Sequence, residues 1–189
     1  MGYCLFGVHK NSQNANEKRR KMQIFDRKLK KYFPNYILQS LLATIALTII
    51  LYFINIFTNT AIVASLGATT FIIFAMPKYE TAQPRRVIGG HISGIIVGIL
   101  CFYLYSHIQN ENNFFLSYEM FKILIPAISV GLAIFTMVIT NTEHPPAAGT
   151  ALGITIQGWS YSTILVIIST ILLLSLFKYL LKTWLKDLV

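Results

Sequence analysis

Residues 140–153, TNTEHPPAAGTALG, interrupt the apolar character of this chain and decide how it folds. A carboxylate, an imidazole and two consecutive prolines lie here between apolar runs. Because a residue that precedes proline is biased toward extended backbone, we expect His144 and Pro145 to be non-helical and the preceding helix to end near Glu143. Pro146 can begin a new helix, where proline loses no hydrogen bond. The stretch therefore predicts two helices separated by a sharp break.

Composition indicates a membrane protein. Of the 189 residues, 54% are hydrophobic and only 12% are charged, whereas soluble domains carry about 25% charged residues. Too few charges are present to cover a surface that faces water. Because apolar runs recur from Tyr36 to Leu181, we expect an all-α membrane protein with a single transmembrane domain at residues 35–186.

Six apolar segments are expected to form the membrane helices. They cover residues 36–57, 61–76, 87–107, 121–140, 147–158 and 161–181. Four are close to the roughly 20 residues that a helix needs to cross hydrocarbon. The second and fifth are shorter and reach only about 24 and 18 Å at about 1.5 Å per residue. Each can cross fully or enter as a half-helix shielded by its neighbours, and the sequence leaves both possibilities open.

Basic residues predict the orientation. Residues 1–34 carry nine Lys and Arg in a chain of net charge +9. We interpret them as a cytoplasmic tail that contacts anionic membrane lipids, and we expect no nucleic-acid partner. If all six segments cross, every one of the 16 Lys and Arg except Lys122 lies on the cytoplasmic side. This satisfies the positive-inside rule and predicts a multi-pass plasma-membrane protein with both termini in the cytoplasm.

The chain also contains a weak internal repeat. TNTAIVASLG at 58–67 and TNTEHPPAAG at 140–149 share Thr-Asn-Thr and the final Gly, and they start 82 positions apart. Each opens a short segment that lies between two long ones. Three crossings per unit require the second unit to be inverted relative to the first. Two inverted three-segment repeats with short middle segments are typical of transporters, whose substrate sites lie where the repeats meet.

Small and polar residues in the two short segments are the candidate site. Gly149 and Thr150 follow the break, and Ser65, Gly67 and Thr69 lie in the first short segment. Small residues let a second backbone approach closely. A helix that starts after the break presents free N–H groups and the positive end of its dipole, which attract anions.

Several of these residues have a plainer interpretation. His144 can lie in a tight surface turn exposed to water, with Glu143 beside it. His91, which follows two glycines early in the third segment, can be a structural hydrogen-bond partner. Arg85 can be a topology anchor instead of a group that recruits anions. The sequence does not decide between these interpretations.

Two long stretches resemble the signatures of a known family. SLGATTFIIFAMPKYETAQPRRVIGGH at 65–91 and EHPPAAGTALG at 143–153 are similar to the HPP family of integral membrane proteins, named for its His-Pro-Pro. The resemblance covers roughly residues 35–182, and the name-giving residues correspond to His144, Pro145 and Pro146. Its AQPR and GGH stretches correspond to residues 82–85 and 89–91. Plastid and cyanobacterial relatives are known as nitrite transporters, so the resemblance implies a small-anion substrate.

The leading functional hypothesis is a transporter or channel for a small anion, with nitrite as a candidate. An intramembrane enzyme that uses Glu143, His144 and His91 is the main alternative, and a purely structural membrane subunit is a third. We expect no metal and no cofactor, because three or four protein ligands in suitable spacing are not apparent. Whether the chain forms a homo-oligomer stays open.

Overall fold

The computed structural model describes residues 29–54, 60–110 and 115–188. The chain divides into two units between Phe33 and Pro34. Apart from the first residues of α2, the helices, contacts and sites below belong to the second unit. Most of the basic tail predicted at residues 1–34 lies outside the described residues, as do the first two residues of the earlier repeat, Thr58 and Asn59.

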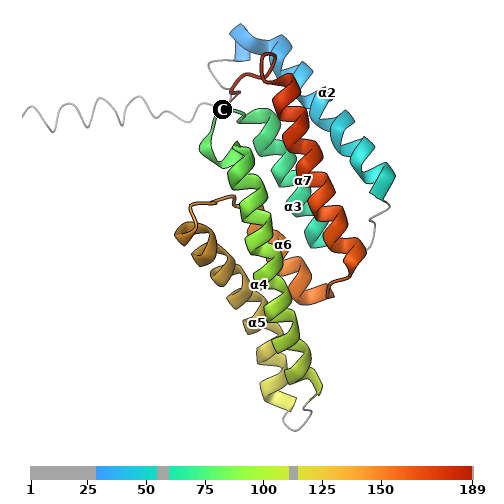
Figure 1. Cartoon of the computed structure of the whole chain (residues 1–189), viewed down its shortest axis with the longest axis vertical. Helices are drawn as coiled ribbons and strands as arrows, with labels where there is room; N and C mark the ends of the chain where they lie inside the picture. Colours follow the sequence, from blue (N-terminus) through green and yellow to red (C-terminus); the bar gives the residue numbers. More distant parts are fainter. Residues whose placement is uncertain (1–28, 55–59, 111–114, 189) are drawn as a thin grey trace, which may run out of the picture. The chain divides into compact units, whose positions relative to one another are not determined.

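The described residues form an all-α protein, as predicted (Figure 1). Four helices are long and apolar enough to cross a membrane, over Lys31–Ile49, Pro84–Ile108, Met120–Ile139 and Tyr161–Leu181. Two helices are short, with 16 and 12 residues, and the order long, short, long occurs twice. The inversion of the second three-segment repeat relative to the first stays a prediction. The elements are α2 (Leu29–Ile54), α3 (Thr60–Ala75), the 3₁₀ helix η1 (Glu80–Ala82), α4 (Pro84–Asn110), α5 (Phe115–Ile139), α6 (Pro146–Gln157) and α7 (Tyr161–Leu181).

Helix α2 starts before the apolar run that predicted it. It begins at Leu29, but its backbone is non-helical at Tyr32, with φ −118° and ψ 19°. Pro34 therefore lies in the first turn of the continuous part of the helix. Proline is tolerated there because the first N–H groups of a helix have no partner within it.

Helix α5 ends four residues earlier than predicted, at Ile139 instead of near Glu143. Asn141 adopts a left-handed conformation with φ 53°, which asparagine tolerates better than most residues. Its N–H donates to the Val138 carbonyl at 3.2 Å, and the N–H of Thr142 donates to the Met137 carbonyl at 2.9 Å. This paired closure is the Schellman motif, which ends a helix at the left-handed residue before the prolines exert any effect.

The start of α6 confirms one prediction and corrects another. Pro146 is the first residue of the helix, as expected. Pro145 was expected to be extended, but it is helical, with φ −51° and ψ −39°. The reason is a tight turn in which the N–H groups of Ala147 and Ala148 donate to the carbonyls of His144 and Pro145. This turn outweighs the extended bias of a residue before proline.

Helix α4 carries a row of glycines against which the break and α6 pack. A Cβ atom added at Gly90 would lie 2.7 Å from the Cβ of His144, and one added at Gly94 would overlap the carbonyl oxygen of Ala147. Gly98 approaches the backbone of Ala151 in the same way. Side chains at these positions would push the two helices apart, so the glycines allow α6 to lie close beside α4.

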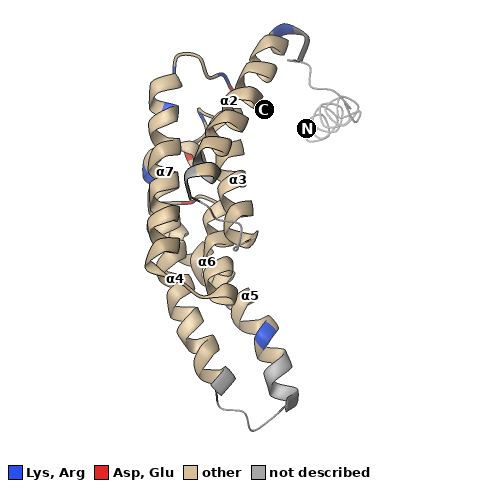
Figure 2. Ribbon diagram, turned by 90° about the vertical axis from the view of Figure 1, so that its right-hand side faces the viewer, with Lys and Arg blue, Asp and Glu red and all other residues tan. Residues whose placement is uncertain are grey.

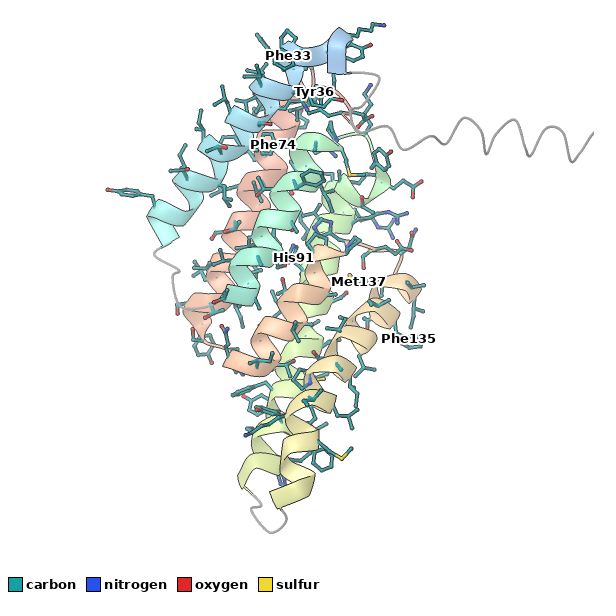
Figure 3. The ribbon with its side chains drawn as sticks, turned by 180° about the vertical axis from the view of Figure 1, so that it is seen from behind. Phe33, Tyr36, Phe74, His91, Phe135 and Met137 are labelled. Carbon is teal, nitrogen blue, oxygen red and sulfur yellow. The ribbon has the colours of Figure 1, made fainter. Side chains whose placement is uncertain are left out.

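The surface of α5 suits lipid. Phe135 is 64% exposed and Ile123 is 76% exposed, and in Figure 3 Phe135 points away from the bundle. Exposed apolar side chains continue along this helix at Leu124, Ile128 and Leu132. A surface of this kind is expected where hydrocarbon, and not water, surrounds the protein.

The chain after α7 folds back toward α2 and α3. The buried Gln39 amide donates to the Lys186 carbonyl at 2.8 Å and accepts from the Lys186 N–H at 3.1 Å. The Tyr36 hydroxyl donates to the Leu188 carbonyl at 2.7 Å, and the Leu188 N–H donates to the Ala75 carbonyl at 2.9 Å. These bonds attach the C-terminal segment to the end of α3, near Tyr36 and Phe74 (Figure 3).

Candidate functional site

Five polar side chains meet inside the bundle. Ser65 and Thr69 come from α3, His91 from α4, His144 from the break and Thr150 from α6. All five are buried, and four of them have no exposed surface at all; Figure 3 shows His91 in the interior. All five were predicted site residues. The structure therefore brings residues from both short segments together in one cluster.

Thr69 connects the two imidazoles. Its hydroxyl oxygen lies 3.0 Å from Nε2 of His91 and 3.0 Å from Nε2 of His144. The ring centroids are 5.2 Å apart. On its other side, Nδ1 of His91 lies 2.9 Å from the Thr150 hydroxyl. One threonine thus bridges the helix α4 histidine and the histidine of the break.

Both ends of this cluster terminate on backbone carbonyls. At one end, Nδ1 of His144 donates to the Thr81 carbonyl at 2.8 Å. At the other end, the Ser65 hydroxyl lies 2.9 Å from the Thr150 hydroxyl and donates to the Pro146 carbonyl at 2.5 Å. The result is a continuous chain of six hydrogen bonds, from η1 through both histidines to the first turn of α6.

The environment of His144 excludes the solvated-turn interpretation. Its side chain has no exposed surface, so that interpretation is wrong. Burial lowers the pKa of His144 from 6.5 to about 4, although its bond to the Thr81 carbonyl acts in the opposite direction. Because a carbonyl oxygen can only accept, the hydrogen of the neutral ring lies on Nδ1.

A charged group lies beside the cluster, but it is not the predicted one. Arg86 forms an ion pair with Glu143 and a second one, at 2.6 Å, with Glu80. Arg85, the arginine chosen from the sequence, is exposed. Neighbouring residues on a helix point about 100° apart, and only Arg86 points toward the break. Sequence alone does not give this rotation.

The first N–H groups of α6 are not free. Those of Ala147 and Ala148 donate to the carbonyls of His144 and Pro145, at 2.9 and 3.2 Å, and Pro146 has no N–H. The expectation that open N–H groups face a ligand is therefore wrong for this first turn. Side chains, and not the helix start, supply the polar groups of the site.

The two glycines of the repeat differ in their surroundings. A Cβ atom at Gly149 would lie 3.3 Å from the Cβ of Ser65, so α3 and α6 are close here, as expected. Around Gly67, the described residues leave the space of a Cβ atom open to beyond 4 Å. The close approach predicted at Gly67 is therefore absent from the described part of the chain.

Comparison with known proteins identifies the family. Residues 30–184 match the family described as HPP, transmembrane region. This chain belongs to the HPP transmembrane family. The resemblance found from the His144, Pro145 and Pro146 motif is thereby confirmed.

Similar curated proteins include two transmembrane proteins of Dictyostelium discoideum. One is 34% identical over a match that covers 48% of this HPP chain and 28% of the relative. The other is 31% identical over a match that covers 61% of this HPP chain and 34% of the relative. The HPP chain thus spans about a third or less of the length of these relatives. No solved structure matches it. These matches indicate a membrane family and no enzymatic one.

Three features of the HPP site escaped the sequence analysis. The Thr81 carbonyl is a backbone group, which leaves no mark in the sequence. Arg86 was missed because the sequence pointed to its neighbour, Arg85, as the candidate arginine of the site. Gly94 and Gly98 did carry a signal, because with Gly90 they repeat every four residues, a spacing typical of closely packed membrane helices.

A pocket of about 270 Å³ adjoins His144 on the side of α5. Its other lining residues are apolar except Glu143; they are Ile134, Met137, Val138, Pro145 and Ala148. The pocket therefore lies next to His144, at the end of the hydrogen-bonded chain that is formed by the Thr81 carbonyl.

The described residues contain no group of three or more His, Cys, Asp or Glu side chains placed to hold a metal ion. Protein metal sites usually require three or four such ligands. The two imidazoles are instead occupied by hydroxyl and carbonyl partners. The hydroxyls and imidazoles of the cluster can form hydrogen bonds and exchange protons.

Proposed function

We propose that this HPP protein is a transporter or channel that carries a small anion across the membrane, with nitrite as the first candidate. The observation that carries the proposal is the buried chain of hydroxyls and imidazoles between α3, α4 and α6. Ionisable side chains inside a membrane domain are costly, and they usually mark the pathway of an ion or a proton.

The chemistry of the cluster favours an anion over a cation. Its five side chains are hydroxyls and imidazoles, which donate hydrogen bonds and, in the case of imidazole, can become positive. A cation pathway would need carboxylates or carbonyls directed at the ion, whereas Thr81 and Pro146 already use their carbonyls to accept from His144 and Ser65. Nitrite transport by plastid and cyanobacterial relatives agrees with this choice.

We place the protein in the plasma membrane with both termini in the cytoplasm. In Figure 2 the basic residues of the described part of the second unit lie mostly at the end of the bundle where α4 begins, and one basic residue lies on α5 toward the other end. This distribution supports the positive-inside orientation. The Arg86–Glu143 ion pair would then lie toward the cytoplasmic side of the cluster.

Uptake by proteoliposomes tests the proposal. The full chain is reconstituted, external nitrite is added, and luminal nitrite is measured with nitrate, formate or chloride as competitor. Protein-free liposomes measure the leak of nitrous acid through lipid. We expect uptake above this leak and competition by at least one other small anion. Uptake equal to the leak for every anion would refute the proposed function.

A further inference from the structure

The buried cluster is one hydrogen short when its histidines are neutral. Six hydrogen bonds connect the Thr81 carbonyl to the Pro146 carbonyl through His144, Thr69, His91, Thr150 and Ser65. Each of the three hydroxyls supplies one hydrogen, and each neutral imidazole supplies one. The terminal carbonyls supply none. Five hydrogens therefore serve six contacts.

The positions of the terminal hydrogens follow from the carbonyls. His144 must donate to Thr81 through Nδ1, and Ser65 must donate to Pro146. One contact between them is then left as two lone pairs facing each other at 2.9–3.0 Å. Thr69 cannot relieve this shortage, because the Ser65 carbonyl, 3.0 Å from its hydroxyl, is one more acceptor.

One added proton completes the chain. As an imidazolium, His91 donates through Nδ1 to Thr150 and through Nε2 to Thr69. Thr150 then donates to Ser65, and Thr69 donates to Nε2 of His144, so that all six contacts hold a hydrogen. A second proton would turn the Thr69 hydroxyl from His144 to the Ser65 carbonyl and place two imidazoliums at a ring-centroid separation of 5.2 Å, where like charges repel. The geometry therefore gives the cluster a capacity of one proton.

A buried imidazolium without a counter-ion is unfavourable, because it loses its hydration. An anion that enters with the proton removes this cost, so binding of the proton and of the anion must favour each other. We infer that the cluster takes up one proton with each anion, which makes the protein an electroneutral anion–proton symporter. This inference rests on the proposed function and adds the coupling ion to it.

The charged side chains near the cluster already have partners of their own. The proton on the imidazoles is therefore the charge that changes when an anion binds. Arg86 on α4 pairs with Glu80 on η1 and with Glu143 in the break. Lys178 on α7 donates to the Ala82 carbonyl at 2.7 Å. On α3 and α6 the groups that face the histidines are the uncharged hydroxyls of Ser65, Thr69 and Thr150.

Substitution of Thr150 separates proton coupling from packing. Thr150→Val keeps the shape of the side chain and removes its hydroxyl. Two short chains then remain, with four contacts and four hydrogens, so the neutral cluster is complete and no longer requires a proton. Thr150→Ser keeps the hydroxyl and serves as the matched control.

The experiment measures luminal pH and nitrite together in proteoliposomes of the full chain, with the protein-free leak subtracted. A potassium gradient with valinomycin sets the membrane potential. For the parent protein and Thr150→Ser we expect one proton per nitrite, a rate that rises as external pH falls, and no response to the potential. For Thr150→Val we expect the proton-to-nitrite ratio to fall toward zero.

Two results would overturn the inference. Parent uptake that follows an inside-positive potential without luminal acidification would refute proton coupling and leave anion transport intact. An unchanged proton-to-nitrite ratio in Thr150→Val would refute the assigned cluster. If Thr150→Val does not assemble, the parent ratio decides alone. Absence of uptake in every case would refute the proposed function together with this inference.

Discussion

Burial lowers the pKa of the His144 imidazole from 6.5 to about 4, which makes stability depend on pH. Above about pH 6.5 the ring is neutral in the folded and unfolded chain, and its full contribution is present. Between pH 6.5 and 4 the unfolded chain binds a proton that the folded chain does not, so stability falls with pH. At about 1.4 kcal/mol per pKa unit, the loss is about 3 kcal/mol.

This dependence can be measured on purified protein without an anion substrate. We expect the melting temperature of the parent to fall between pH 6.5 and pH 4. His144→Gln keeps an amide donor for the Thr81 carbonyl but cannot be protonated, so its melting temperature should fall less. Equal pH slopes for both proteins would show that His144 is not the buried titrating group.

The sequence was sufficient to find the members of the cluster but not their partners. Ser65, Thr69, His91, His144 and Thr150 stand out because they are polar residues in apolar surroundings. Their order along the chain of hydrogen bonds depends on how α3, α4 and α6 rotate about their axes. That rotation is set by packing, and it also explains why Arg86 and not Arg85 pairs with Glu143.

At the scale of the helices, the glycines of α4 control how closely α6 can approach. A methyl group at Gly94 would overlap the Ala147 carbonyl, and such overpacking costs about 1–3 kcal/mol. Gly131 on α5 has nothing within 4 Å of an added Cβ among the described residues. Alanine there should stabilise the helix by up to about 1 kcal/mol.

We therefore predict opposite effects from the same substitution. Gly94→Ala should lower the melting temperature in detergent and reduce the yield of monodisperse protein, whereas Gly131→Ala should leave both unchanged or raised. Size-exclusion chromatography after graded heating makes the comparison. A Gly94→Ala protein as stable as Gly131→Ala would contradict the close contact between α4 and α6.

The sequence predicted the helices better than it predicted their ends. All six apolar segments became helices because runs of this length and composition are strong signals. The end of α5 was misplaced because the left-handed Asn141 closes the helix before Pro145 and Pro146 are reached. Pro145 was expected to be extended, but the turn bonds of Ala147 and Ala148 hold it helical.

For the whole molecule, the central expectation is the inverted orientation of its two halves. If α2–α4 and α5–α7 each cross three times, the α4–α5 connection lies outside the cell and the C-terminus lies inside. Reporter fusions in residues 111–114 and after Val189 should then report opposite sides. A fusion after Val189 leaves the Gln39–Lys186 contacts intact. Reporters on the same side would exclude the inverted repeat.

The buried cluster is the claim on which the functional account depends, and His144 tests it most directly. The measurement is nitrite uptake by proteoliposomes that contain equal amounts of parent, His144→Ala or His107→Ala protein. His107 is an exposed histidine near the end of α4 and serves as the matched control. His144→Ala leaves the Thr81 carbonyl and the Thr69 hydroxyl without their imidazole partner, and an unpaired buried polar group costs about 1–3 kcal/mol, which corresponds to roughly a five- to hundredfold weaker transport. We predict this loss for His144→Ala and parental uptake for His107→Ala. Parental uptake by His144→Ala would show that the anion does not pass through this cluster.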